Sequence, residues 1–245
     1  MSRLSFDFGY IIQTLPVLMV GLKMTVFISV LAILFSLLIG LSGAAARTLK
    51  VPVVSRIVAV YVDIIRNTPL LVHIFFVYFG LPVIGIKLDA VTVGIVTLSL
   101  WGGAFAVENF RGGTDAVSKS LIESGESLGL SRWQVVRHII VPLGFRISFP
   151  AFSNTAVSVI KNSAYMTGIG VVELTFVAVD RMAYDFKTYE MLLAIAVIYL
   201  ALIWGASYLF SKIERRLDFN KKTVKGGKGR GGFVEKLALS FRRGN

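Results

Sequence analysis

Long apolar runs alternate with short polar stretches along this chain. A helix needs about 20 mostly apolar residues to cross the hydrocarbon core of a bilayer, and each run approaches or exceeds that length. The sequence therefore predicts five spans, at about residues 15–46, 54–79, 90–110, 147–179 and 189–210. The first run is longer than a bilayer requires, so we expect it to tilt or to extend beyond the membrane.

Three features modify these spans. Pro69 lacks a backbone N–H and should kink or break the second span. Gly40 and Gly43 near the end of the first span are small enough for close helix packing. The polar triplet Lys161–Asn162–Ser163 interrupts the fourth span, and a polar loop at 180–187 should precede the last span.

One long stretch of mixed polarity, residues 115–142, differs from the rest of the chain. Asp115 is a candidate helix N-cap, and apolar or small residues follow at helical spacing. Gly129 permits a turn, and Ser131 with Gln134 fits a capping box that starts a second helix. Pro142 is expected to end or kink that helix. The pattern predicts a helix, a glycine turn and a helix outside the bilayer core.

Composition favours an all-α polytopic membrane protein over a soluble domain. Hydrophobic residues make up 55% of the 245 residues and charged residues only 16%, with a mean hydropathy of +0.74. The net charge of +12 could indicate nucleic-acid binding, but the basic residues gather in particular loops and in the tail. There is no cysteine, which excludes disulfides and thiolate metal sites.

The distribution of basic residues predicts the orientation in the membrane. With five spans, 19 Lys and Arg residues fall on the side of the tail and four on the other side. The positive-inside rule then places the N-terminus outside and the C-terminus in the cytoplasm. We expect an external segment at 1–14, which does not read as a cleavable signal peptide. A membrane domain at 15–217 and a basic, disordered tail at 218–245 should follow.

Several motifs together resemble one family. Glu123-Ser124-Gly125, Gly129 and Ile139-Ile-Val-Pro142 look like the E-A-A…G…I-x-L-P loop of bacterial ABC-importer permeases. Further segments are similar to the polar amino-acid branch (histidine, glutamate and glutamine type) in the family's order and spacing. These are Arg66–Leu71, Phe79–Pro82, Glu108–Gly113, Lys161–Ser163 and Glu173–Leu174.

The resemblance implies a type I ABC importer permease with a cytoplasmic coupling helix, located in the bacterial inner membrane. Glu123, Ser124, Gly125 and Gly129 would then contact the ATPase. The chain would bind no cofactor itself, and ATP would bind to the partner ATPase dimer. The other implied partners are a second permease, the same or related, and an extracytoplasmic amino-acid-binding protein. No catalytic role is expected for this chain.

Two departures from the family pattern bear on function. Ser124 and Gly125 replace two alanines, which keeps the positions small but lowers helix propensity at Gly125. Lys161-Asn162-Ser163-Ala replaces the more common K-D-T-S and looks like glutamate/aspartate permeases. Lys161 could attract a carboxylate, and a substrate path would include Thr68, Lys161, Asn162 and Ser163.

Each functional interpretation has an alternative. The 115–142 element could be an amphipathic helix at the membrane surface, and Lys161–Ser163 could join two permease chains. Arg66 could pair with Asp63 or with lipid phosphate. Glu108 and Glu173 could relay protons, but helix-end hydrogen bonds or salt bridges with Arg111 or Arg181 are favoured.

A transporter that works alone, driven by an ion gradient, or a channel is the main alternative function. The charges within the spans support it, whereas the odd number of spans and the lack of a visible inverted repeat disfavour it. His73 and His138 lack metal-ligand spacing. The glycine-rich stretch at 225–232 lacks the strand and helix that flank a phosphate loop.

Overall fold

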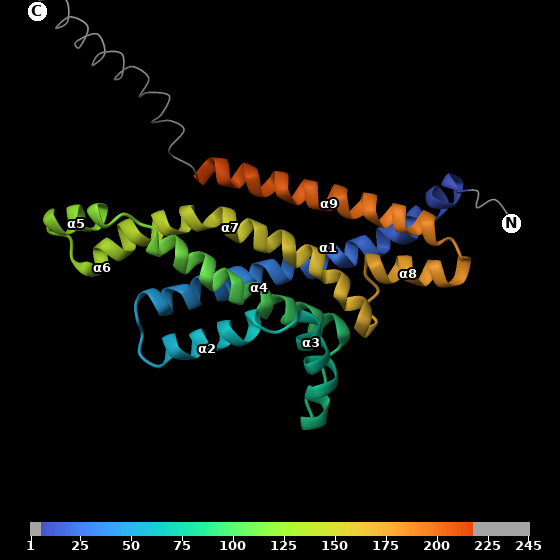
Figure 1. Ribbon diagram of the computed structural model, residues 1–245, viewed down its shortest axis with the longest axis horizontal. Helices are drawn as coiled ribbons and strands as arrows, with labels where there is room; N and C mark the ends of the chain where they lie inside the picture. The colour runs from blue at the N-terminus through green and yellow to red at the C-terminus, as the bar shows by residue number, and fades with distance from the viewer. Residues whose placement is uncertain (1–5, 218–245) are drawn as a thin grey trace, which may run out of the picture.

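The computed structural model describes residues 6–217 as a bundle of helices whose longest members run along one axis (Figure 1). The α-helices are α1 (Phe8–Thr48), α2 (Val54–Arg66), α3 (Leu70–Phe75), α4 (Ala90–Asp115), α5 (Lys119–Ser127), α6 (Arg132–Val135), α7 (Val141–Asn162), α8 (Leu174–Asp185) and α9 (Thr188–Leu217). The π-helical turns are η1 (Phe76–Gly80) and η3 (Val136–Ile140), and the 3₁₀ helices are η2 (Leu81–Ile84) and η4 (Ser163–Ile169). The predicted all-α class is confirmed for these residues, whereas the predicted disordered tail at 218–245 lies outside them.

Four helical stretches are long and apolar enough to cross a membrane. They are Phe8–Thr48, Ala90–Asp115, Arg132–Ile169 and Thr188–Leu217. A fifth span exists if α2 and the stretch Leu70–Ile84 are counted together, although they meet at an angle of 108°. The break lies at Pro69, the N-cap of α3, so the predicted break at this proline is confirmed.

The prediction for the fourth span is wrong at its end. The helix that passes through α6, η3, α7 and η4 ends at Ile169 instead of near 179, because Gly170 adopts a left-handed conformation with φ of +79°. A separate helix, α8, then occupies most of the predicted polar loop at 180–187, since it runs to Asp185. The change from α to 3₁₀ geometry at Ser163 does match the interruption predicted there.

The centre of the bundle is the crossing of α1 and α4, where small residues let the two helices approach closely. A Cβ atom on Gly40 would lie 2.4 Å from the Cβ of Ala106, and one on Gly43 would lie 2.6 Å from a methyl group of Val107. The predicted role of these two glycines in close packing is confirmed. Small buried residues of α1 recur every three or four positions from Gly21 to Gly43, namely Gly21, Thr25, Ser29, Ala32, Ser36, Gly40 and Gly43, and Ala44 follows.

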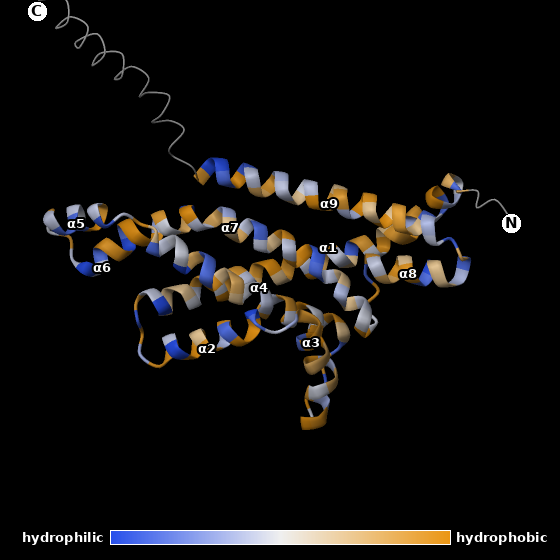
Figure 2. Cartoon of the chain, viewed as in Figure 1, coloured by the Kyte–Doolittle hydropathy of each residue, from blue (hydrophilic) through white to orange (hydrophobic). Residues whose placement is uncertain are grey.

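The two ends of the described chain lie at opposite ends of the long axis. Figure 1 shows α5 and α6 at the end where α9 finishes, and α8 at the end where α1 starts. Hydrophilic residues gather on α5, α6 and the end of α9, whereas α3 and the turns after it leave the bundle as a largely hydrophobic arm (Figure 2). The mixed-polarity element therefore lies at one end of the bundle, together with Leu217.

Candidate functional site

The element between α4 and α7 is a short helix, a glycine turn and a second helix, as predicted. Gly129 has a φ of +81°, a conformation that costs about 1–2 kcal/mol for a residue with a Cβ. Ser131 and Gln134 form the predicted capping box: the Ser131 N–H donates to Gln134 Oε1 at 2.8 Å, and the Gln134 N–H donates to Ser131 Oγ at 3.4 Å. These local bonds fix the turn and the start of α6.

At the borders of this element, the expected N-cap at Asp115 and the expected helix end at Pro142 are both wrong. Asp115 is not an N-cap but the last residue of α4, where its carboxylate accepts from Arg111 one helical turn earlier, at 2.6 Å. Ser118 takes the N-cap position of α5 instead. Pro142 does not end the second helix, because it lies in the first turn of α7, where a missing N–H is tolerated. The wider π-helical turn η3 leads directly into that turn.

Gly125 is the predicted site residue that holds the element together. It is buried, and a Cβ there would lie 2.6 Å from Ile139 Cδ1 and 3.5 Å from Val135 Cγ2. Glu123 and Ser124 lie on the exposed side of α5, where the Ser124 hydroxyl donates to the Ser120 carbonyl at 2.7 Å. The element therefore packs α5 through a glycine and presents Glu123 and Ser124 outward.

Charged residues join the end of α4, from which the chain continues into this element, to the end of α1. Glu108 on α4 forms ion pairs with Arg47 at the end of α1 and with Arg111, the latter at 2.8 Å. Arg111 also pairs with Asp115 at 2.6 Å. The predicted pair between Glu108 and Arg111 is confirmed. The pair with Arg47 was not predicted, because the first span was expected to end at about residue 46, whereas α1 continues to Thr48.

The predicted polar groups near the break in the second span have local partners. The Thr68 hydroxyl donates to the Ile64 carbonyl at 2.6 Å and lies 2.5 Å from His73 Nε2. Arg66 does not pair with Asp63. Its guanidinium lies 5.1 Å from the centre of the Phe105 ring, at a distance typical of a cation–π contact.

The residues of the triplet Lys161–Asn162–Ser163, at the end of α7, differ in their exposure. Lys161 is exposed, whereas Ser163 is fully buried and its hydroxyl donates to the Ile160 carbonyl at 2.8 Å. Within residues 6–217, no hydrogen bond joins Thr68 to any of these three residues. The helix that follows Thr68, α3, does contact η4, which begins at Ser163. Gly168 of η4 lies against Leu71 and Phe75 of α3.

A buried acid outside the predicted site joins four elements. Glu173 is fully buried and caps α8 by accepting the N–H groups of Thr175 and Phe176 at 2.9 and 2.8 Å. Its side-chain oxygens also accept hydrogen bonds from three hydroxyl groups, those of Thr25 on α1, Thr167 on η4 and Tyr199 on α9. The helix-end hydrogen bonding favoured for this residue is confirmed. Its role as a junction had no local signal in the sequence.

Known proteins resemble this chain over nearly all of its described length. The glutamine transport system permease protein GlnP of Escherichia coli is 35% identical over 216 residues, covering 87% of this chain and 99% of that protein. The L-cystine transport system permease protein TcyB of Bacillus subtilis is 32% identical and covers 83% of this chain and 87% of that protein.

Solved structures have the same fold. A crystal structure of an amino acid ABC transporter with histidines matches with a TM-score of 0.81 and 30% identity, covering 87% of this chain and 100% of the other. The MetNI methionine ABC transporter matches with a TM-score of 0.72 at 18% identity, which supports the fold alone.

The family model described as "Binding-protein-dependent transport system inner membrane component" matches residues 36–219. The chain is thus a multi-pass permease subunit of an ABC transporter; it has no catalytic role, and ATP is used by a partner ATPase. Because the match covers most of the sequence, the chain belongs to the family of binding-protein-dependent transport system inner membrane components.

Proposed function

We propose that this chain is the permease of an importer of polar amino acids, in which the α5–Gly129–α6 element receives the motion of the ATPase. The observation that carries the proposal is the construction of this element. It is fixed by the capping box and the glycine turn, packed through Gly125 against Ile139, and continuous in sequence with α4 and α7. A rigid element of this kind can transmit a displacement to α4 and α7 without deforming.

Variants of exposed and turn residues test this proposal in a reconstituted complex. Glu123→Arg and Gly129→Val should abolish uptake driven by ATP while the chain still inserts and purifies with its partners. Lys87→Glu is the control, because Lys87 is also exposed but lies in the loop before α4, whereas α5 follows the end of α4. Normal uptake by Glu123→Arg would contradict the assigned contact.

We infer that the end of the bundle that carries α5 and α6 faces the cytoplasm. Arg47, Arg111 and Lys119 lie at this end, as the positive-inside rule requires. Because the chain has no cysteine, single cysteines report the orientation directly. In intact cells, Tyr184→Cys at the other end should react with an impermeant maleimide, and Ser124→Cys should not. The reverse pattern would invert the topology.

We propose that the chain pairs with a second permease, identical or related. The arm formed by α3, η1 and η2 leaves the bundle (Figure 1) and exposes large apolar side chains, with Phe76 70% and Val83 85% exposed. A second chain would cover this surface within the membrane. Phe76→Cys should then form a cross-link between two permeases in the assembled transporter, and Trp204→Cys on the exposed face of α9 should not. An equal yield from both would argue against this surface.

For the substrate we propose glutamate or aspartate as the first candidates. Lys161 offers an exposed positive charge at the end of α7, and the neutral Asn162 adds no carboxylate that would repel an acidic substrate. Glutamine is the second candidate, because the similar Escherichia coli permease is named for it. The amino acid retained by the co-purified binding protein separates the two. In uptake assays, Lys161→Met should weaken transport of an acidic substrate more than that of glutamine.

The alternative of a transporter that works alone predicts a different result. The purified permease, reconstituted without ATPase, would then accumulate amino acid in response to an ion gradient. Our proposal requires that this preparation does not accumulate substrate, and that addition of the ATPase and the binding protein with ATP restores uptake.

A further inference from the structure

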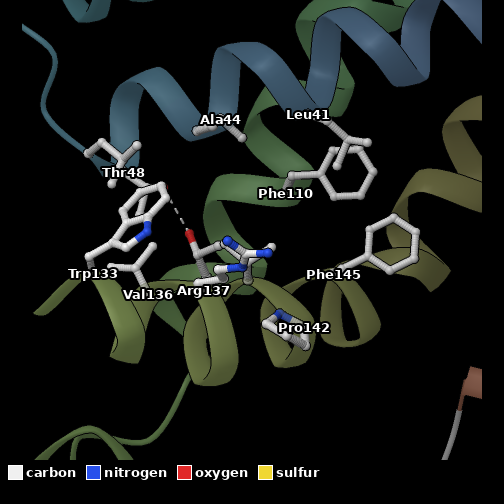
Figure 3. Close-up of a pocket in the computed structure, with 13 residues that line it drawn as sticks. Leu41, Ala44, Thr48, Phe110, Trp133, Val136, Arg137, Pro142 and Phe145 are labelled. Carbon is white, nitrogen blue, oxygen red and sulfur yellow. Dashed lines mark hydrogen bonds between the residues drawn. The ribbon is translucent and has the colours of Figure 1, made fainter. Parts of the chain in front are cut away.

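An apolar pocket lies between the end of α1, α4 and the helix that runs through α6, η3 and α7. Its volume is about 630 Å³, within the range of pockets that enclose small ligands or several side chains. Figure 3 shows Leu41, Ala44 and Thr48 on one wall and Trp133, Val136 and Pro142 on the facing wall. Trp133 is 60% exposed and Leu49 is 45% exposed, so large apolar side chains line the pocket without being covered.

The end of α9 lies near this pocket. Phe110 and Phe145 line it, and both belong to the aromatic cluster against which Phe210 and Leu217 of α9 pack. Leu217 is the last described residue, and residues 218–245 follow it. The tail therefore starts beside the wall of the pocket.

The sequence of the tail supplies a segment that fits. Phe233, Val234, Leu237, Ala238 and Phe241 recur at the spacing of one face of an amphipathic helix. The 15 residues between Leu217 and Phe233 are rich in glycine and lysine. A glycine-rich linker of this length spans roughly 20 Å on average, which suffices to return the segment to the pocket.

One acid of the tail can pair with a basic residue of the pocket. Arg137 lines the pocket, and among residues 6–217 it forms no ion pair; Figure 3 shows its guanidinium between Trp133 and Phe145. Glu235 is the single acid in the apolar part of the tail, and in a docked helix it would lie on the polar side, at the edge of the pocket. Arg137 is itself exposed, so its long side chain can reach Glu235 from the pocket.

We propose that residues 233–241 dock in this pocket and brace α6 and η3 against the end of α1. The segment would cover Trp133 and Leu49 and neutralise the charge of Arg137. The proposal does not depend on which side of the membrane the pocket faces, because Leu217, after which the tail begins, and the pocket lie at the same end of the bundle (Figure 1). It also does not depend on the transported substrate.

Disulfide cross-linking tests the docking in the full chain, in membranes that contain the assembled transporter. Val136→Cys in the pocket should oxidise with Leu237→Cys several times faster than Ile213→Cys does. Ile213 is the matched control, because it is exposed on α9 and lies closer to the tail in the sequence. Leu49→Cys on the opposite wall should also react with Leu237→Cys, so the test survives if one pocket variant fails to fold.

A charge exchange adds a second criterion. Glu235→Arg should lower the cross-linking rate about threefold, the size expected for one partly exposed ion pair, and Arg137→Glu in the same chain should restore it. Equal cross-linking of Val136→Cys and Ile213→Cys would overturn the proposal. So would transfer of a fluorophore at position 237 to the lipid surface, reported by quenching from spin-labelled anionic lipids.

Discussion

Gly125 of α5 lies so close to Ile139 of η3 that a Cβ on the glycine would be 2.6 Å from Ile139 Cδ1. The contact joins the two halves of the element that we assign to ATPase contact. The nearest atom is the end of a flexible side chain, so Ile139 can move aside at modest cost.

The first prediction follows from this contact. Gly125→Ala should change stability little, because about 1 kcal/mol of gained helix propensity offsets the displacement of Ile139. In a protein that already carries Ile139→Val, which removes the Cδ1 atom, Gly125→Ala should be stabilising. A double-mutant cycle should then give a coupling energy of about 1 kcal/mol. Thermal unfolding in detergent measures both values. Strict additivity of the two substitutions would contradict the contact.

The second prediction concerns the crossing of α4 and α7. A Cβ on Gly113 would lie 2.4 Å from the carbonyl oxygen of Gly144, which is backbone and cannot move aside alone. Gly113→Ala should therefore destabilise the protein by about 1–3 kcal/mol. Gly112→Ala is the control, because no atom lies within 4 Å of its added Cβ, and it should be neutral or stabilising. Equal effects on the unfolding midpoint would refute this packing.

The third prediction concerns Glu173. Glu173→Ala leaves buried hydroxyl and N–H groups without an acceptor and should lower the free energy of unfolding by about 3 kcal/mol. Glu173→Gln retains one acceptor oxygen and should lose less. The exposed Glu126→Ala serves as a control in the same unfolding assay. A loss from Glu173→Ala no larger than that of the control would remove Glu173 from its role as a junction.

The fourth prediction concerns pH. Asp89 caps α4, and hydrogen bonds from the side chain and backbone of Thr92 hold its pKa below the ordinary value of 3.8. Because the folded pKa is lowered, its carboxylate stabilises the protein above the ordinary pKa, and this contribution is lost as pH falls through the folded value. The difference in unfolding midpoint between wild type and Asp89→Asn should therefore shrink in acid and stay constant near neutral pH. A difference that grows with acidity would contradict the assignment.

Local signals in the sequence were sufficient to predict part of the structure. Apolar run length located the long helices, Pro69 marked the break in the second span, and Ser131 with Gln134 located the start of α6. Each of these signals depends on residues within a few positions of one another. The glycine turn at Gly129 was found for the same reason.

Long-range contacts explain what the sequence did not reveal. Glu173 meets Thr25 across 148 positions, and Arg47 meets Glu108 across 61 positions, so no window of sequence contains either pair. Asp115 is of a residue type that often caps helices, but its ion pair with Arg111 keeps it within α4. The predicted site residues Thr68, Lys161, Asn162 and Ser163 remain predictions for a substrate path.

One cross-linking measurement tests the central claim, that α5 is the surface through which the ATPase acts. Glu123→Cys is combined with the partner ATPase and a short thiol-to-amine cross-linker in the assembled transporter. Tyr184→Cys is the control, because Tyr184 is 75% exposed on α8 at the other end of the bundle. The account predicts a covalent permease–ATPase product from the Glu123→Cys variant, with a yield that changes on ATP binding, and none from the Tyr184→Cys variant. A product from the control variant and none from the α5 variant would contradict it.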